Sequence, residues 1–242
     1  MDQDTLTNLF RRKLDCYPAG LAASIAAARP EECDEVVHPV SRGEAQGTYG
    51  MRCACHVARM MASQHDIRLS TDSIADAATA IQGASVMEHG TMLFVAGAAV
   101  QQVTDNRLLW FPVEAASIPK AVVAGHCVGV GIRWDQGFQN DCDDKAVSDP
   151  RRPVPQTSGH AILLQGWKRS VEFRRVPRRR LFRPGTWFST VTSAEPAFRA
   201  INPKREAEGW WHGDAWVAVA DVLAALMHGH GIILVKREEA WQ

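Results

Sequence analysis

A glycine-punctuated segment, Gln46 to Gly50, leads into two closely spaced cysteines, Cys53 and Cys55. Residues 53–66 contain no helix-breaking residue, and their alanines and methionines favour a helix. A thiol in the first turn of a helix lies near exposed backbone N–H groups and the positive end of the helix dipole, and both favour the nucleophilic thiolate. The spacing therefore predicts a cysteine nucleophile where a loop enters a helix.

A thiolate nucleophile needs partners elsewhere in the chain. It requires an imidazole within hydrogen-bond reach to hold and deliver a proton, and a donor such as a Gln side chain to stabilise the oxyanion of a tetrahedral intermediate. One solution places the cysteine first, then a histidine at the start of a strand, then an asparagine. His160 opens a segment, 160–167, with the composition of a buried strand, and Asn202 follows it in the chain.

These residues carry a family resemblance. The run Gln46-Gly47, Gly50 and Cys53-Ala54 resembles the signature Q-G-x-C-G-S/A-C-W/Y-A of the papain-like cysteine peptidases. The run Gly159-His160-Ala161 is similar to the family's histidine strand, and Phe198 to Asn202 resembles its F-x-x-x-N segment. The resemblance spans roughly residues 33 to 236.

The resemblance implies an α+β, papain-like two-lobe fold and a cysteine peptidase or amide hydrolase that works by acyl transfer. On this reading Cys53 is the nucleophile, His160 shuttles the proton, Asn202 orients His160, and Gln46 with the Cys53 backbone N–H holds the oxyanion. A peptide or protein substrate would lie between a helical lobe and a β-rich lobe.

Two alternatives concern the nucleophile itself. Aligned from Gln46 without a gap, the family's nucleophile position falls on Arg52, and a one-residue insertion in the loop restores Cys53, followed by Ala54 where the family has an aromatic. Cys55 is the second candidate. It stands about 200° around the helix from Cys53, so both thiols cannot face one cleft. The run Cys-x-Cys-His at 53–56 also suggests a metal site, but no second pair at zinc spacing follows, so we expect neither metal nor other cofactor.

A basic run, Lys168 to Arg183, holds eight basic residues against one acidic residue. Such a run is usually a solvated loop or hairpin, and the alternative is a contact surface for an acidic partner. With Arg52 at the ungapped nucleophile position, this run motivates a second hypothesis: a catalytically inactive papain-like domain that serves as a binding or assembly module. We expect His228 and His230 to be structural or surface residues.

The elements that must position these residues follow from periodicity and punctuation. Helices are predicted over 4–14, 17–29, 53–66, 70–80, 92–103, 118–124 and 221–228. Strands are predicted over 127–134, 160–167, 186–192, 197–201, 215–219 and 231–236, and a loop over 31–50. This order predicts an N-terminal helical extension (1–32), a helical lobe (33–115) and a barrel-like β-rich lobe (116–242) with the basic run at 168–183 as an insertion.

Composition narrows the class of protein. The 242 residues include 27 basic and 27 acidic side chains and are 46% hydrophobic, which excludes a disordered polymer and a generally basic nucleic-acid binder. Six cysteines are too few for a disulfide framework. We expect no membrane segment, since no apolar run reaches the required length, and a cytoplasmic protein, since residues 1–14 lack an apolar signal core.

Overall fold

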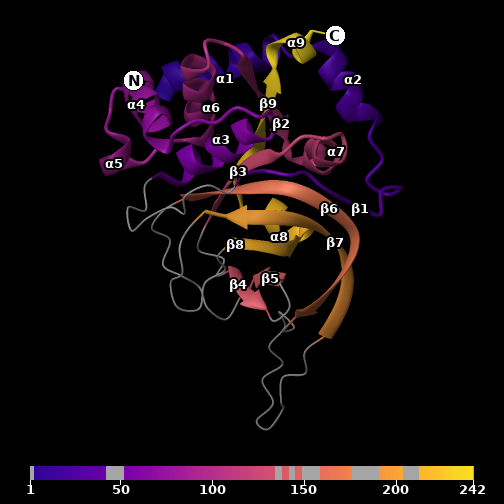
Figure 1. Ribbon diagram of the computed structural model, residues 1–242. Coiled ribbons are helices and arrows are strands. Elements are labelled where there is room, and N and C mark those ends of the chain that lie inside the picture. Colours follow the sequence, from indigo (N-terminus) through magenta and orange to yellow (C-terminus); the bar gives the residue numbers. More distant parts are fainter. Residues whose placement is uncertain are drawn as a thin grey trace.

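The computed structural model describes residues 3–41, 52–133, 138–141, 145–148, 159–175, 191–203 and 213–241 (Figure 1). The helices are α1 (Gln3–Asp15), α2 (Ala19–Ala27), α3 (Cys53–Ser63), α4 (Thr71–Gln82), α5 (Val86–His89), α6 (Leu93–Val103), the 3-10 turn η2 (Ala115–Ser117), α7 (Ile118–Val123), α8 (Val219–Ala225) and α9 (Arg237–Ala240). The strands are β1 (Glu35–Val37), β2 (Leu108–Glu114), β3 (Val128–Arg133), β4 (Phe138–Asp141), β5 (Lys145–Ser148), β6 (Gly159–Arg175), β7 (Val191–Asn202), β8 (Gly213–Ala218) and β9 (Leu226–Lys236).

The described strands form one sheet in the order β2-β9-β3-β6-β7-β8-β5-β4, and the short β1 also pairs with β6. Every pairing is antiparallel except β5 with β8. The long β6 therefore contacts β1, β3 and β7, and it links the strands that lie beneath the helices to those that curve away from them (Figure 1).

Side chains of β6 alternate between two cores, as expected for a strand that is buried on both faces. Ala161 and Leu163 pack with the helices α3, α4 and α6. Ile162 and Leu164 pack on the other face, with α2, α7 and α8. The α3 helix approaches the sheet closely at Gly129, where a Cβ atom would lie only 2.9 Å from the Met61 sulfur. This close packing holds the second half of α3 against β3, the strand that pairs with β6.

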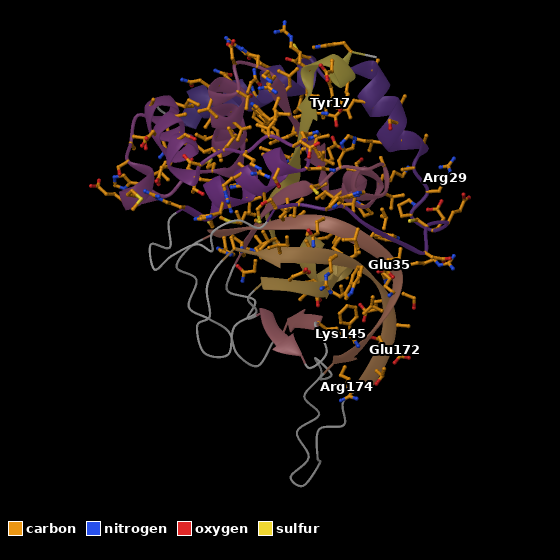
Figure 2. All side chains as sticks on the ribbon, in the orientation of Figure 1. Tyr17, Arg29, Glu35, Lys145, Glu172 and Arg174 are labelled. Atoms are coloured by element: carbon orange, nitrogen blue, oxygen red, sulfur yellow. The ribbon has the colours of Figure 1, made fainter. Side chains whose placement is uncertain are left out.

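The first half of the basic run lies in a strand. Lys168–Arg175 continues β6 and pairs antiparallel with β7, which agrees with the hairpin form of the prediction for these residues. Val171 and Phe173 are buried in a small cluster with Trp216, whereas Glu172 and Arg174 alternate with them on the exposed face (Figure 2). Residues 176–183 lie outside the described part of the chain.

Most predicted elements are confirmed to within a few residues, including the helices at 53–63, 71–82 and 93–103 and the strand at 128–133. The helix predicted over 221–228 is wrong at its end, because α8 stops at Ala225 and the strand predicted over 231–236 already begins at Leu226. The loop prediction for 31–50 is wrong at Glu35–Val37, which form β1. The sequence reading also missed β2, β4, β5 and α5. The strand predicted over 186–192 falls mostly outside the described residues, and the β7 strand begins at Val191.

Candidate active site

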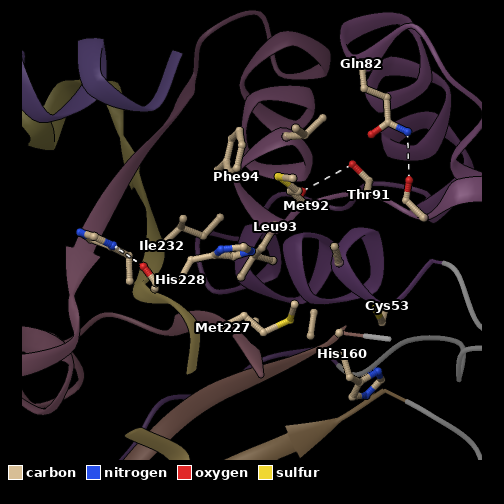
Figure 3. A pocket seen from close by; sticks show the side chains of 18 of the residues that line it. Cys53, Gln82, Thr91, Met92, Leu93, Phe94, His160, Met227, His228 and Ile232 are labelled. Atoms are coloured by element: carbon tan, nitrogen blue, oxygen red, sulfur yellow. Dashed lines mark hydrogen bonds between the residues drawn. The ribbon is translucent and has the colours of Figure 1, made fainter. Parts of the chain in front are cut away.

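A cavity of about 630 Å³ lies where the start of α3 meets β6, and residues of the α5–α6 segment and of β9 complete its wall (Figure 3). Cys53 and His160 both line this cavity, although 107 positions separate them in the chain. Its volume falls in the range of about 300–1,000 Å³ that is usual for binding pockets. Two of the predicted site residues thus share one cavity.

The ring of His160 is held by Asn202. His160 Nε2 lies 2.8 Å from Asn202 Oδ1, and the two side chains are 8% and 2% exposed. Because an amide oxygen only accepts hydrogen bonds, Nε2 is the nitrogen that carries the hydrogen and donates it. In a neutral imidazole the other nitrogen, Nδ1, is then the basic one. The hydrogen bond thus selects both the tautomer and the orientation of the ring.

Cys53 is the first residue of α3 and is 9% exposed. The preceding residue, Arg52, is the N-cap and offers no side-chain acceptor to the N–H groups of the first turn. These N–H groups and the positive end of the helix dipole favour a negative charge at this position. The local structure therefore has the geometry in which a thiol is activated as a nucleophile.

Cys55 has a different environment, although it is only two residues away. It is fully buried (0% exposed) in the core between α3 and the sheet, and it does not line the cavity. Burial, and then the negative charge of Cys53, raise the pKa of Cys55 to about 12. A thiol with such a pKa is protonated at neutral pH, so Cys55 is a core side chain.

Arg52, the ungapped nucleophile position, is directed away from the cavity. Its guanidinium forms an ion pair with Asp72 in α4, and its Nε lies 2.6 Å from the Met87 sulfur in α5. Arg52 is not among the residues that line the cavity. From the start of α3, Cys53 and the small Ala54 line the cavity.

Gln46, the predicted oxyanion donor, lies outside the described residues. The basic run is partly neutralised within the chain. Lys168 Nζ lies 2.7 Å from Glu35 Oε2, and Arg169 Nη2 lies 2.5 Å from Asp34 Oδ1. Two cations of the run thus pair with carboxylates in β1 and just before it. That the run binds an acidic partner stays a prediction.

Sequence reasoning missed most of the cavity wall. Met92, Leu93 and Phe94 line it from the start of α6, and Met227 lines it from the start of β9 (Figure 3). His228 and His230, which we expected to be structural or surface residues, line it as well. The run Met-His-Gly-His-Gly at 227–231 matches no motif for such a role, so only the fold could reveal it. No Asp, Glu, Lys or Arg occurs among the described lining residues.

The described residues contain no group of three or more His, Cys, Asp or Glu that could hold a metal ion. None of the helices in the same part of the chain is long and apolar enough to cross a membrane.

Comparison with known proteins places this geometry in a structural context. No family model and no curated protein matches the chain. Among solved structures, xylellain, a cysteine protease from Xylella fastidiosa, matches with a TM-score of 0.53 and 13% identity over 87% of this chain and 88% of that one. Digestive procathepsin L 3 of Tenebrio molitor larval midgut is a weaker match, with a TM-score of 0.47 and 13% identity over 88% and 77% of the two chains.

At 13% identity the xylellain match concerns the fold alone, and it extends over most of both chains. It agrees with the helices packed on an antiparallel sheet that the described residues form, so the prediction of an α+β, papain-like architecture is confirmed. The chain has the fold of the papain-like cysteine peptidases.

Proposed function

We propose that the protein is a cysteine peptidase or amide hydrolase in which Cys53, His160 and Asn202 act together. The observation that carries the proposal is the His160–Asn202 hydrogen bond, made by a histidine that shares its cavity with a helix-start cysteine. The helix start favours a thiolate at Cys53, and the hydrogen bond to Asn202 orients the His160 ring. A lone buried histidine or a lone helix-start thiol would not support the same conclusion.

The chemistry is acyl transfer in two steps. Cys53 Sγ, as thiolate, adds to the carbonyl carbon of an amide, and the C–N bond breaks as protonated His160 gives its proton to the leaving amine. Water then adds to the thioester while His160 takes one of its protons, and the C–S bond breaks to release the acid and return the thiolate. The Cys53 backbone N–H, with Gln46 as the predicted second donor, stabilises the oxyanion of both tetrahedral intermediates.

The character of the cavity supports a peptide substrate with an apolar side chain near the scissile bond. The described wall is built mainly from methionine, leucine, phenylalanine, alanine and glycine, and it also includes several histidines. Burial of a large aliphatic or aromatic side chain against such a wall stabilises the complex by about 1.5–3 kcal/mol. A charged side chain would lose hydration there without gaining a described partner of opposite charge.

Hydrolysis of casein and of a fluorogenic peptide library tests the proposal. Wild type should release products, and Cys53→Ala and His160→Ala should each lower kcat by at least a hundredfold. Cys16→Ser is the matched control because Cys16 is an exposed thiol outside the cavity, and it should keep wild-type activity. Wild-type protein that is folded but hydrolyses no peptide or amide would instead favour the inactive binding module.

A further inference from the structure

The N-terminal helix contributes to the cavity through Phe10. The Phe10 ring lines the cavity together with His230, and the two ring centroids are 5.0 Å apart in an edge-to-face arrangement. The ring also lies 6.0 Å from that of Phe94 and 6.3 Å from that of Trp110. Phe10 is therefore part of an aromatic cluster that joins α1 to α6, β2 and β9 at one part of the cavity wall.

Further contacts hold α1 in this place. Lys13, three residues after Phe10 and so on the same side of the helix, donates from Nζ to Gln101 Oε1 of α6 at 2.8 Å. Its ammonium group also lies 5.1 Å from the centre of the Phe111 ring of β2, a cation–π distance. Tyr17, just after α1, packs 5.5 Å from the same ring. The position of Phe10 is thus fixed by contacts outside the cavity.

The part of the wall near Cys53 and His160 is built differently. Its described members there include Ala54, Gly131 and Ala161, all of which are small, whereas Gly159 is covered by the Met227 side chain. A Cβ atom at Gly131 would meet no atom within 4 Å, so the space above this strand is open. Small residues near the candidate nucleophile leave room for a substrate side chain, and the aromatic cluster at Phe10 limits how far that side chain can extend.

We infer that Phe10 of α1 is a specificity-determining residue, which sets the largest apolar side chain that the cavity accepts from a peptide substrate. The part of this inference that concerns peptide hydrolysis rests on the proposed function. It assigns a role to a helix that precedes the segment with the papain-like motifs, which begins at about residue 33.

The test uses four fluorogenic substrates, acetyl-X-Ala-aminomethylcoumarin, with X as Ala, Leu, Phe or 2-naphthylalanine. Phe10→Ala removes the ring, so kcat/KM for naphthylalanine relative to Leu should rise at least tenfold. Phe10→Trp enlarges the ring, so kcat/KM for Phe relative to Ala should fall at least tenfold. Leu14→Ala is the matched control, because Leu14 is an exposed side chain on the same helix, and it should leave both ratios unchanged.

A second measurement separates this inference from the proposed function. Binding of the uncleaved acetyl-X-Ala-amides to the Cys53→Ala protein, measured by saturation-transfer NMR, needs the cavity but no chemistry. The Phe10 variants should change the relative affinities for the four amides in the same direction as they change the kcat/KM ratios. If wild type cleaves nothing but binding shifts in this way, the proposed function fails and the role of Phe10 stands. Binding and cleavage ratios that change less than twofold in both folded Phe10 variants would overturn the inference.

Discussion

His160 Nε2 donates a hydrogen bond to Asn202 Oδ1 across 2.8 Å, and the pairing of β6 with β7 explains why the two residues meet. The register sets Leu163 opposite Ile201, so His160 and Asn202 lie at the same end of the strand pair. A shift of one residue in this register would turn one side chain to the opposite face. The sheet therefore acts as the scaffold that orients the imidazole.

Replacement of Asn202 should lower the rate without removing the nucleophile. In Asn202→Ala the imidazole loses its acceptor and its preferred tautomer, so we expect kcat for peptide hydrolysis to fall about tenfold to a hundredfold, with KM changed less than threefold. Asn202→Asp keeps an acceptor oxygen and should retain more activity than Asn202→Ala. Equal loss in both variants, or a loss confined to KM, would contradict an orienting role.

The sequence singled out Cys53, His160 and Asn202 as candidates because a helix-start thiol and a strand-start histidine followed by an asparagine are patterns that can be read along the chain. Cys53 at a helix start and His160 at a strand start could be predicted, and the structure brings both to one cavity. The wall residues could not be predicted, because Phe10, Leu93 and Met227 read as ordinary apolar positions of three separate elements. Only the tertiary arrangement turns them toward a common space.

Gly166 should tolerate no side chain. A Cβ atom there would lie 2.7 Å from the Val36 backbone oxygen and 2.9 Å from the Arg199 Cβ, and neither can swing away as a flexible side chain could. We expect Gly166→Ala to lower the free energy of unfolding in urea by about 1–3 kcal/mol, since β1 or β7 must shift. Gly131→Ala, in the neighbouring β3 where a Cβ meets nothing within 4 Å, is the control and should change it by less than about 0.5 kcal/mol. Similar losses in both variants would contradict the close approach at Gly166 as the cause of the effect.

Physical reasons explain why β2 and the second half of β6 were not predicted from the sequence. The β2 segment contains Pro112, a residue that argues against a central strand, but β2 lies at the edge of the described sheet, where a proline is tolerated. The extension of β6 past Trp167 was obscured by its many charges. The alternation of Val171 and Phe173 with exposed Glu172 was the signal that could have revealed it.

Acid should destabilise the protein partly through His126. Burial first, and then the neighbouring His65 and His38, lower the pKa of His126 from its ordinary value of 6.5 to about 4. Between these values the unfolded chain binds the proton and the folded chain does not, so stability is complete above pH 6.5 and falls as the pH drops toward 4. This histidine contributes at most about 1.4 kcal/mol per pH unit to the slope.

Urea unfolding of wild type and His126→Gln at several pH values between 4 and 8 measures this contribution. The variant should show a shallower decline in unfolding free energy below pH 6.5, and the difference between the two proteins should be constant above it. His56, whose pKa burial also lowers to about 4, keeps its share in both proteins and does not affect the comparison. Parallel curves over the whole range would contradict a neutral, half-buried His126.

The most direct test of the central claim is to map the site of covalent labelling by a peptidyl vinyl sulfone, which reacts with an activated thiolate, by mass spectrometry. The account predicts a single adduct on Cys53 in wild type and in Cys55→Ala, no adduct in Cys53→Ala, and labelling at least tenfold slower in His160→Ala. An adduct on Cys55, or labelling that persists in Cys53→Ala at the wild-type rate, would contradict it.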